Sequence, residues 1–290
     1  MFYQSIRIQI AIITKLINNT KFKIDKGDHL LDTHTHILWN IDDGSKNQCM
    51  SLQMLEIAAR SGTKAIFATP HVIERANKPS WEEIKEKTQQ LRQLCAEAQI
   101  DIMLYPGAEV QMNWELLPEL GATGAYCLNG GRYLLIELPA AEIPAYADEF
   151  WYELELKGIT PILAHPERYQ QLRENPDLLL LWRRRGMLMQ CNSGSFTCMF
   201  VTSVCENAKV LLANGLVDLL GSDGHRSEGR NTDMSRAAAV IRQLAGEEVL
   251  RQLTETNPQA ILKNQEIELK QPKVLLEDKP KSFWQKLFGK

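Results

Sequence analysis

The stretch Leu30-Leu-Asp-Thr-His-Thr-His36 is a short apolar run that ends in two histidines separated by one residue. A run of this kind is typical of a strand that is buried on both faces of a parallel sheet. Side chains two positions apart on a strand lie on the same face, so His34 and His36 can bind one metal ion from the same side. An isolated pair of this kind also fits two hydrogen-bonded histidines of a core.

Similar apolar runs recur along the chain, and longer amphipathic segments separate them. The predicted strands are 30–36, 65–69, 100–105, 133–138, 160–164, 187–192 and 217–222. Capping boxes at Ser45 with Gln48 and at Ser80 with Glu83, and Pro176 after Asn175, predict helix starts between them. Alternating strands and helices predict an α/β fold with parallel strands. A closed barrel fits this pattern better than an open doubly wound sheet, which the pattern leaves open.

Composition places the chain among ordinary globular proteins. Its 290 residues are 44% hydrophobic and 24% charged, which excludes disordered and collagen-like classes. With 33 basic and 36 acidic residues the net charge is −3, so we expect no nucleic-acid partner. The six cysteines form no CxxC pair, and we expect reduced thiols in a cytoplasmic protein.

The two ends of the chain differ from the middle. The apolar run 8–14 is too short for a signal peptide or a membrane span, so we expect a soluble protein. We predict an N-terminal extension over 1–28, a barrel over 29–262 and a lysine-rich tail over 263–290. Near its end the tail carries four lysines beside Phe283, Trp284, Leu287 and Phe288, a composition compatible with peripheral membrane contact, with partner binding or with fraying.

Histidines and acids gather at the carboxyl ends of six predicted strands. They are His34, His36, His71, Glu109, Glu137, His165, Asp223 and His225, and Asp43 follows the first strand in an Asp-Asp-Gly loop. In a βα barrel these ends converge on one mouth. Imidazole and carboxylate ligands suit transition metals such as Zn, Mn or Fe, and nine ligands are too many for a single ion. The sequence therefore predicts a catalytic centre of two or three ions.

Two arginines follow the same strands. Arg168 comes three residues after His165, and Arg230 comes seven residues after Asp223. Four carboxylates against three divalent ions leave a positive surplus, and a guanidinium presents paired donors to phosphate oxygens. We therefore expect a phosphate ester as substrate.

These motifs together resemble the polymerase and histidinol phosphatase (PHP) superfamily. The matching segments are Asp32-Thr-His-Thr-His36, Ile41-Asp-Asp-Gly-Ser45, Ala68-Thr-Pro-His71, Gly107-Ala-Glu109, Ile136-Glu-Leu-Pro139, Ala164-His-Pro-Glu-Arg-Tyr169 and Gly221-Ser-Asp-Gly-His225. Within that superfamily the chain is similar to the bacterial manganese-dependent protein-tyrosine phosphatases of capsule and exopolysaccharide loci. The resemblance covers residues 30–262 and implies a distorted (β/α)7 barrel of the TIM-like PHP type.

The resemblance also implies the ligands and the reaction. His34, His36, Glu109 and Asp223 would hold a first ion, Glu109, Glu137 and His165 a second, and Asp43, His71 and His225 a third. The ions would be manganese, with iron, zinc, cobalt or magnesium as alternatives. Arg168 and Arg230 would bind the phosphate while a metal-bridging hydroxide attacks it, and His225 or Asp43 would help the leaving group to depart. The implied substrate is a bacterial tyrosine autokinase.

Other functions stay open at this point. A small-molecule phosphatase that acts on histidinol phosphate would use the same ligands. A non-catalytic scaffold that is stabilised by metal is another alternative, although structural sites tend to be closed. A cysteine phosphatase is disfavoured because no cysteine is followed by an arginine six positions later.

Overall fold

The computed structural model describes residues 29–269, except for 121–123. Its strands are β1 (Leu30–Thr35), β2 (Thr63–Ala68), β3 (His71–Val72), β4 (Met103–Pro106), β5 (Glu109–Gln111), β6 (Tyr133–Glu137), β7 (Thr160–Ala164), β8 (Leu188–Asn192) and β9 (Leu219–Gly221). The α-helices are α2 (Gln48–Arg60), α3 (Trp81–Glu97), α4 (Ala147–Leu156), α5 (Gln170–Glu174), α6 (Pro176–Arg184), α7 (Ser193–Phe196), α8 (Thr202–Ala213), α9 (Ser235–Ala245), α10 (Glu247–Arg251) and α11 (Asn257–Leu262). Short 3₁₀ turns cover Trp114–Leu116, Leu128–Gly130 and Pro166–Arg168, and a π-turn covers Gln252–Thr256.

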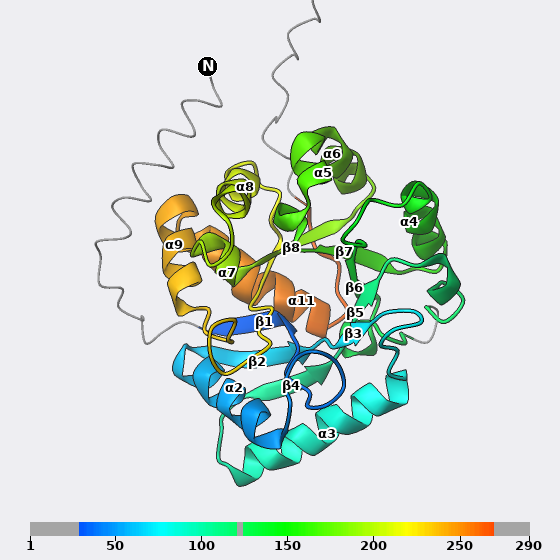
Figure 1. The fold of residues 1–290 in the computed structure, drawn as a ribbon. Helices are drawn as coiled ribbons and strands as arrows, with labels where there is room; N and C mark the ends of the chain where they lie inside the picture. The colour runs from blue at the N-terminus through cyan, green and yellow to red at the C-terminus, as the bar shows by residue number, and fades with distance from the viewer. Residues whose placement is uncertain (1–28, 121–123, 270–290) are drawn as a thin grey trace, which may run out of the picture.

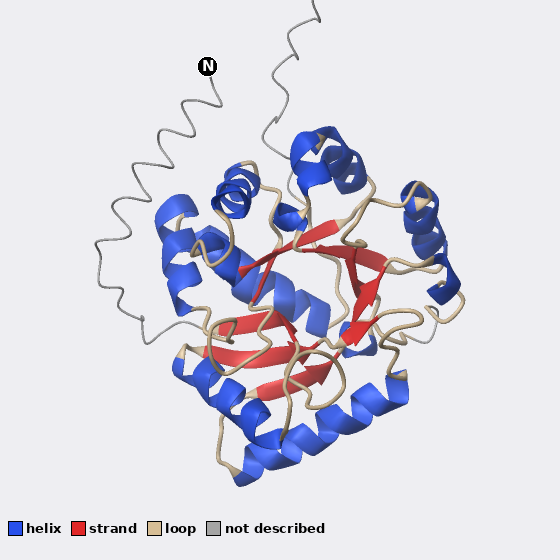
Figure 2. Ribbon diagram, in the orientation of Figure 1, coloured by secondary structure: helices blue, strands red, loops and turns tan. Residues whose placement is uncertain are grey.

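The strands curl into a distorted barrel with helices around the outside (Figures 1 and 2). One sheet has the order β1-β2-β4 and the other β3-β5-β6-β7-β8-β9, and all of their pairs are parallel. β1 meets β9 where the amide of Asp223 donates to the carbonyl of His34 at 2.7 Å and that of His36 to Gly224 at 3.0 Å. The predicted α/β barrel is therefore confirmed.

Two of the seven predicted strands, 65–69 and 100–105, are each followed by a second short strand that was not predicted. Thr69 and Pro70 separate β2 from β3, and Gly107 and Ala108 separate β4 from β5. A side chain on Gly107 would meet Leu128 at 2.6 Å, so glycine permits this close approach. After these residues β3 pairs with β5, and His71 lies opposite Glu109. Both site residues therefore belong to the sheet that begins β3-β5-β6.

Alternate residues of each strand face two different cores. Leu135 and Ile162 belong to the cluster inside the barrel, whereas Leu134 and Leu163 pack in the larger cluster with the surrounding helices. This alternation follows from the two-residue period of a strand. Ile261 of α11 joins the inner cluster and helps to fill the barrel.

The helix starts were predicted with mixed success. Ser80 caps α3 by accepting from the amide of Glu83, as expected, and α6 begins at Pro176. The capping box at Ser45 is wrong, because Asn47 caps α2. The Ser45 hydroxyl instead donates to the carbonyl of Asn47 at 3.0 Å.

The chain continues past α11 along the barrel. The hydroxyl of Tyr133 donates to the carbonyl of Gln265 at 2.5 Å, and Ile267 is buried in the inner cluster. The predicted extension 1–28 and the tail from residue 270 onward lie outside the described residues. In the described part of the chain, none of the helices combines the length and apolarity needed to span a bilayer.

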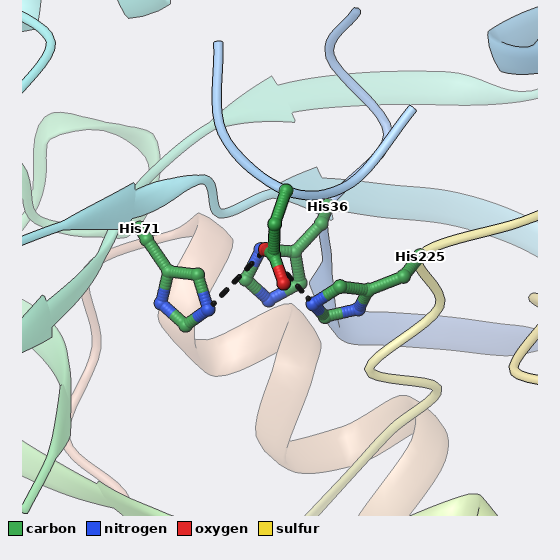
Figure 3. Close-up of side chains that lie close together, drawn as sticks. His36, His71 and His225 are labelled. Carbon is green, nitrogen blue, oxygen red and sulfur yellow. Dashed lines mark ion pairs between the residues drawn. The ribbon is translucent and has the colours of Figure 1, made fainter. Parts of the chain in front are cut away.

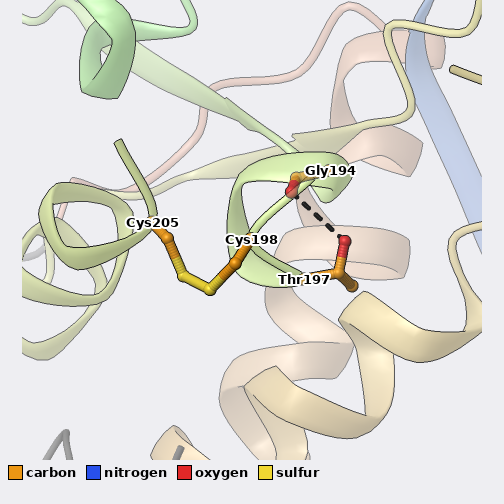
Figure 4. The surroundings of a disulfide bond; sticks show 4 residues. All are labelled: Gly194, Thr197, Cys198 and Cys205. Atoms are coloured by element: carbon orange, nitrogen blue, oxygen red, sulfur yellow. Dashed lines mark hydrogen bonds between the residues drawn. A yellow bond between two sulfur atoms is a disulfide. The ribbon is translucent and has the colours of Figure 1, made fainter. Parts of the chain in front are cut away.

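The expectation of six reduced cysteines is wrong for two of them. Cys198 and Cys205 form a disulfide across the loop between α7 and α8 (Figure 4). Of the four free thiols, Cys49 is exposed and the others are buried. Burial raises the pKa of Cys127 to about 12, so this thiol is an inert part of the core.

Candidate metal centre

All nine predicted ligands meet at the mouth of the barrel. Each is positioned by a strand or by the residues directly after one, and Asp43 is brought in by the loop after β1. Ion pairs and hydrogen bonds join every member to at least one other, as in the 2.9 Å contact between His165 Nε2 and Glu109 Oε1. The convergence expected from the strand ends is therefore present in the structure.

A first group consists of His34, His36 and Asp223, which are all buried. The two Nε2 atoms of the histidines lie 3.1 Å apart, and each lies 3.4 Å from Asp223 Oδ1. Glu109 Oε2 is close to the same atoms, at 3.1 Å from His34 Nε2 and 3.3 Å from His36 Nε2. These four residues surround one point, as the family resemblance implies for the first ion.

A second group joins His71, Glu109 and Glu137. His71 Nδ1 lies 3.1 Å from Glu109 Oε2 and 3.4 Å from Glu137 Oε1. The resemblance pairs Glu137 with His165 instead. In the structure His165 contacts Oε1 of Glu109, whereas His71 lies on the Oε2 side. His71, and not His165, therefore completes the second group with Glu109 and Glu137.

A third group contains His36, Asp43, His71 and His225 (Figure 3). Asp43 Oδ1 lies 3.3 Å from His225 Nε2 and 3.7 Å from His71 Nε2. Asp43 is 65% exposed, so this group opens toward solvent, whereas the first is enclosed. The two ring nitrogens of His71 thus face two different groups.

The donor set fits divalent metal ions. Four side-chain atoms of the three groups are buried without a hydrogen-bond partner, namely Glu109 Oε2, Asp223 Oδ1, His71 Nδ1 and His225 Nε2. An unsatisfied buried polar atom costs about 1–3 kcal/mol, so four of them at one place point to a missing partner. Imidazole nitrogens and carboxylate oxygens are the ligands of Mn, Fe and Zn.

Hydrogen bonds behind the ligands orient the first two histidines. His34 Nδ1 lies 2.9 Å from Gln190 Oε1, and His36 Nδ1 lies 2.7 Å from Asp42 Oδ2. Because each Nδ1 is engaged, each Nε2 is left to face the group. Asp42 also accepts from the amide of His71 at 3.0 Å and therefore links two groups.

These orienting residues were missed by the sequence prediction. β8 is the strand for which no site residue was predicted, yet Gln190 and Asn192 occupy its carboxyl end. Asn192 Nδ2 donates to Asp223 Oδ2 at 2.5 Å. Polar residues at alternate positions of an otherwise apolar strand were the available signal. Asp42 is the neighbour of Asp43, and only Asp43 was predicted as a site residue.

The buried charges support one another. Burial raises the pKa of Glu109, but the adjacent His34 and His71 outweigh it and hold that pKa well below its usual range. Burial lowers the pKa of His36, whereas Asp42 and Asp223 raise it well above the usual value. Glu109 thus stays ionised, which suits cation binding.

The two predicted arginines both contact Asp223. Arg168 Nη1 lies 3.4 Å from Asp223 Oδ2, and Arg230 Nη2 forms an ion pair with the same oxygen. Their side chains are 36% and 30% exposed, so both can present donors to a ligand at the mouth. Arg230 Nε is buried without a hydrogen-bond partner. An anion at this place would satisfy it.

Comparison with known proteins agrees with this geometry. Residues 30–263 match the family described as capsular polysaccharide synthesis, CpsB/CapC. The chain is 34% identical over 238 residues to the tyrosine-protein phosphatase YwqE of Bacillus subtilis, covering 82% of this chain and 93% of YwqE. It is 28% identical over 241 residues to the tyrosine-protein phosphatase CpsB of Streptococcus pneumoniae, covering 81% and 99% of the two chains.

A solved structure shows the same relationship. It comes from work on YwqE and CpsB, described as unique metal-dependent tyrosine phosphatases. It superimposes with a TM-score of 0.78 at 32% identity and covers 86% of this chain and 100% of that chain. The chain therefore belongs to the CpsB/CapC family of capsular polysaccharide synthesis proteins.

Proposed function

We propose that this protein is a metal-dependent protein-tyrosine phosphatase that acts in capsule or exopolysaccharide synthesis. The observation that carries the proposal is the convergence of nine nitrogen and oxygen ligands on one mouth, with two half-exposed arginines beside them. The names of the family and of its similar relatives support the same activity.

We assign the ligands to three divalent ions. The first set is His34, His36, Glu109 and Asp223, the second is Glu109, Glu137 and His165 with His71 nearby, and the third is Asp43, His71 and His225. Manganese is our first choice, and iron, zinc, cobalt and magnesium are alternatives that the same donors accept. When bound, such ions supply Lewis acidity and lower the pKa of water to near neutrality.

The protein's own residues position the ester and stabilise its charge. Arg168 and Arg230 bind the phosphoryl oxygens, and their shared contact with Asp223 keeps both guanidinium groups directed at the mouth. Burial lowers the pKa of His225 to about 4, which makes it neutral near pH 7 and suited to be a ligand. Asp43 is exposed beside it, and its contact with His225 holds the pKa of Asp43 well below the usual range, so Asp43 stays ionised as a ligand and the proton for the departing tyrosine oxygen has to come from water at the mouth.

The substrate we propose is the phosphorylated tyrosine of a bacterial tyrosine autokinase. A cytoplasmic location would bring the two proteins together, and the tail over 263–290 could hold the enzyme at a membrane surface. We retain 1–28, 29–262 and 263–290 as proposed boundaries of the extension, the barrel and the tail; the first residues of this tail pack on the barrel, with Ile267 in the inner cluster.

Hydrolysis assays with metal analysis test this function. We expect chelation by EDTA to abolish hydrolysis of a phosphotyrosine peptide and added manganese to restore it. Faster hydrolysis of histidinol phosphate than of the peptide would replace the proposed substrate. Protein that binds metal but hydrolyses neither ester would leave only a scaffold role, and activity that persists in chelator would refute metal dependence.

A further inference from the structure

The loop after α7 exposes apolar side chains beside the metal centre. In this loop Met199 is 48% exposed and Val201 is 66% exposed. Among the other exposed large apolar side chains of residues 29–120 and 124–269, Tyr152 and Leu156 share one face of α4, and the rest are at least ten positions from any other along the chain. Exposed apolar side chains that cluster often mark a binding surface.

Phe200, between these two residues, connects the loop to the predicted phosphate site. Its ring centroid lies 5.3 Å from Arg168 Cζ, within the range of a cation–π contact. Arg168 in turn lies 3.4 Å from Asp223. The apolar loop therefore borders the place where we expect the phosphoryl group to bind.

The loop is held in place from several directions. The amide of Met199 donates to the carbonyl of Gly194 at 2.9 Å. A side chain on Gly194 would meet Met199 Sδ at 3.1 Å and Phe200 Cε2 at 3.2 Å, so glycine allows the loop to pack this closely. The Cys198–Cys205 disulfide joins the start of the loop to helix α8 (Figure 4). An anchored surface loses little entropy when a ligand binds to it.

We propose that Met199, Phe200 and Val201 form an apolar wall that receives the aromatic ring of the substrate. The proposal rests on the proposed phosphatase function. In an aryl phosphate the ring is attached through a single oxygen, so it must lie close to the groups that hold the phosphate. The wall is the exposed apolar surface next to Arg168, and ring contacts with such a surface are favourable.

The test compares binding of an aryl ester with binding of phosphate alone. The variants are Met199→Ser/Val201→Ser and Phe200→Ala, and the control is Tyr152→Ser/Leu156→Ser on α4, where the exposed fractions of 56% and 64% are similar. For each protein we would measure KM for a phosphotyrosine peptide and the inhibition constant of inorganic phosphate. Metal content and thermal unfolding verify that each variant is folded and loaded.

We expect the wall variants to raise KM about threefold to tenfold and to leave phosphate inhibition and kcat within twofold of wild type, because phosphate has no ring. The control should change neither constant. An unchanged KM in the Met199/Val201 double variant, which keeps the Phe200–Arg168 contact, would overturn the wall. If Phe200→Ala raises KM and the inhibition constant of phosphate by the same factor, Phe200 positions Arg168 and does not belong to the wall. Inactivity of the wild-type protein on every ester would instead refute the proposed phosphatase function.

Discussion

Replacing Glu109 with glutamine should affect two ions at once. Its Oε2 lies 3.1 Å from His34 Nε2, 3.3 Å from His36 Nε2 and 3.1 Å from His71 Nδ1, and its Oε1 lies 2.9 Å from His165 Nε2. Glutamine has nearly the same size, but its amide is neutral and can offer only one good acceptor. The change therefore removes one negative charge and one ligand atom from the point where the first and second groups meet.

The magnitude follows from the role of the ions. A metal ion contributes several kcal/mol to stabilisation of the transition state, and about 4 kcal/mol corresponds to about a thousandfold in rate. We expect Glu109→Gln to lower kcat/KM on a phosphotyrosine peptide by at least about a thousandfold. Mass spectrometry of the purified protein should find fewer bound ions than in wild type.

Asp218→Asn provides a matched control at the opposite end of the barrel. Asp218 is also a buried carboxylate, and it forms an ion pair with Arg183 and accepts from the amide of Met189 at 2.8 Å. Its loss should lower the free energy of unfolding by about 3–5 kcal/mol but leave the metal content intact. Full activity and full metal content in Glu109→Gln would refute the reasoning.

Three further variants test separate parts of the account. Asp42→Asn should weaken metal binding about 10-fold to 100-fold in calorimetric titration, because it disturbs the orientation of His36; unchanged affinity would contradict this. Arg230→Ala should lower kcat/KM about 100-fold to 1,000-fold with the metal content unchanged, since it removes a donor to the phosphoryl group; a loss of metal instead would make Arg230 structural. Replacing the free cysteines Cys49, Cys95, Cys127 and Cys191 with alanine should leave kcat within about twofold in a folded protein, because their thiols are absent from the three groups; an inactive but folded and metal-loaded variant would point to thiol chemistry.

The strands and the convergence of the histidines and acids could be predicted because both follow local rules. Buried parallel strands are short apolar runs, and residues just after such a run reach the carboxyl end of the barrel. His71 and Glu109 were therefore assigned to the mouth correctly. The short strands β3 and β5 after Pro70 and Gly107 were not predicted, since their pairing depends on how neighbouring strands and Leu128 pack.

Features that depend on contacts between distant residues could not be predicted. Gln190 orients His34, which lies 156 positions away in the sequence, and the residues around Gln190 do not indicate that His34 is its hydrogen-bond partner. The capping box at Ser45 fails because Asn47 takes the cap, a competition that spacing alone does not decide. The Cys198–Cys205 pairing depends on the fold of the α7–α8 loop, which brings the two Cα atoms to 5.0 Å.

Anomalous diffraction from crystals grown with manganese tests the central claim most directly. The account predicts three manganese peaks at the barrel mouth, with Glu109 between the first two and Asp43 beside the third. A mouth without anomalous density, or manganese bound only at other surfaces of the protein, would contradict it.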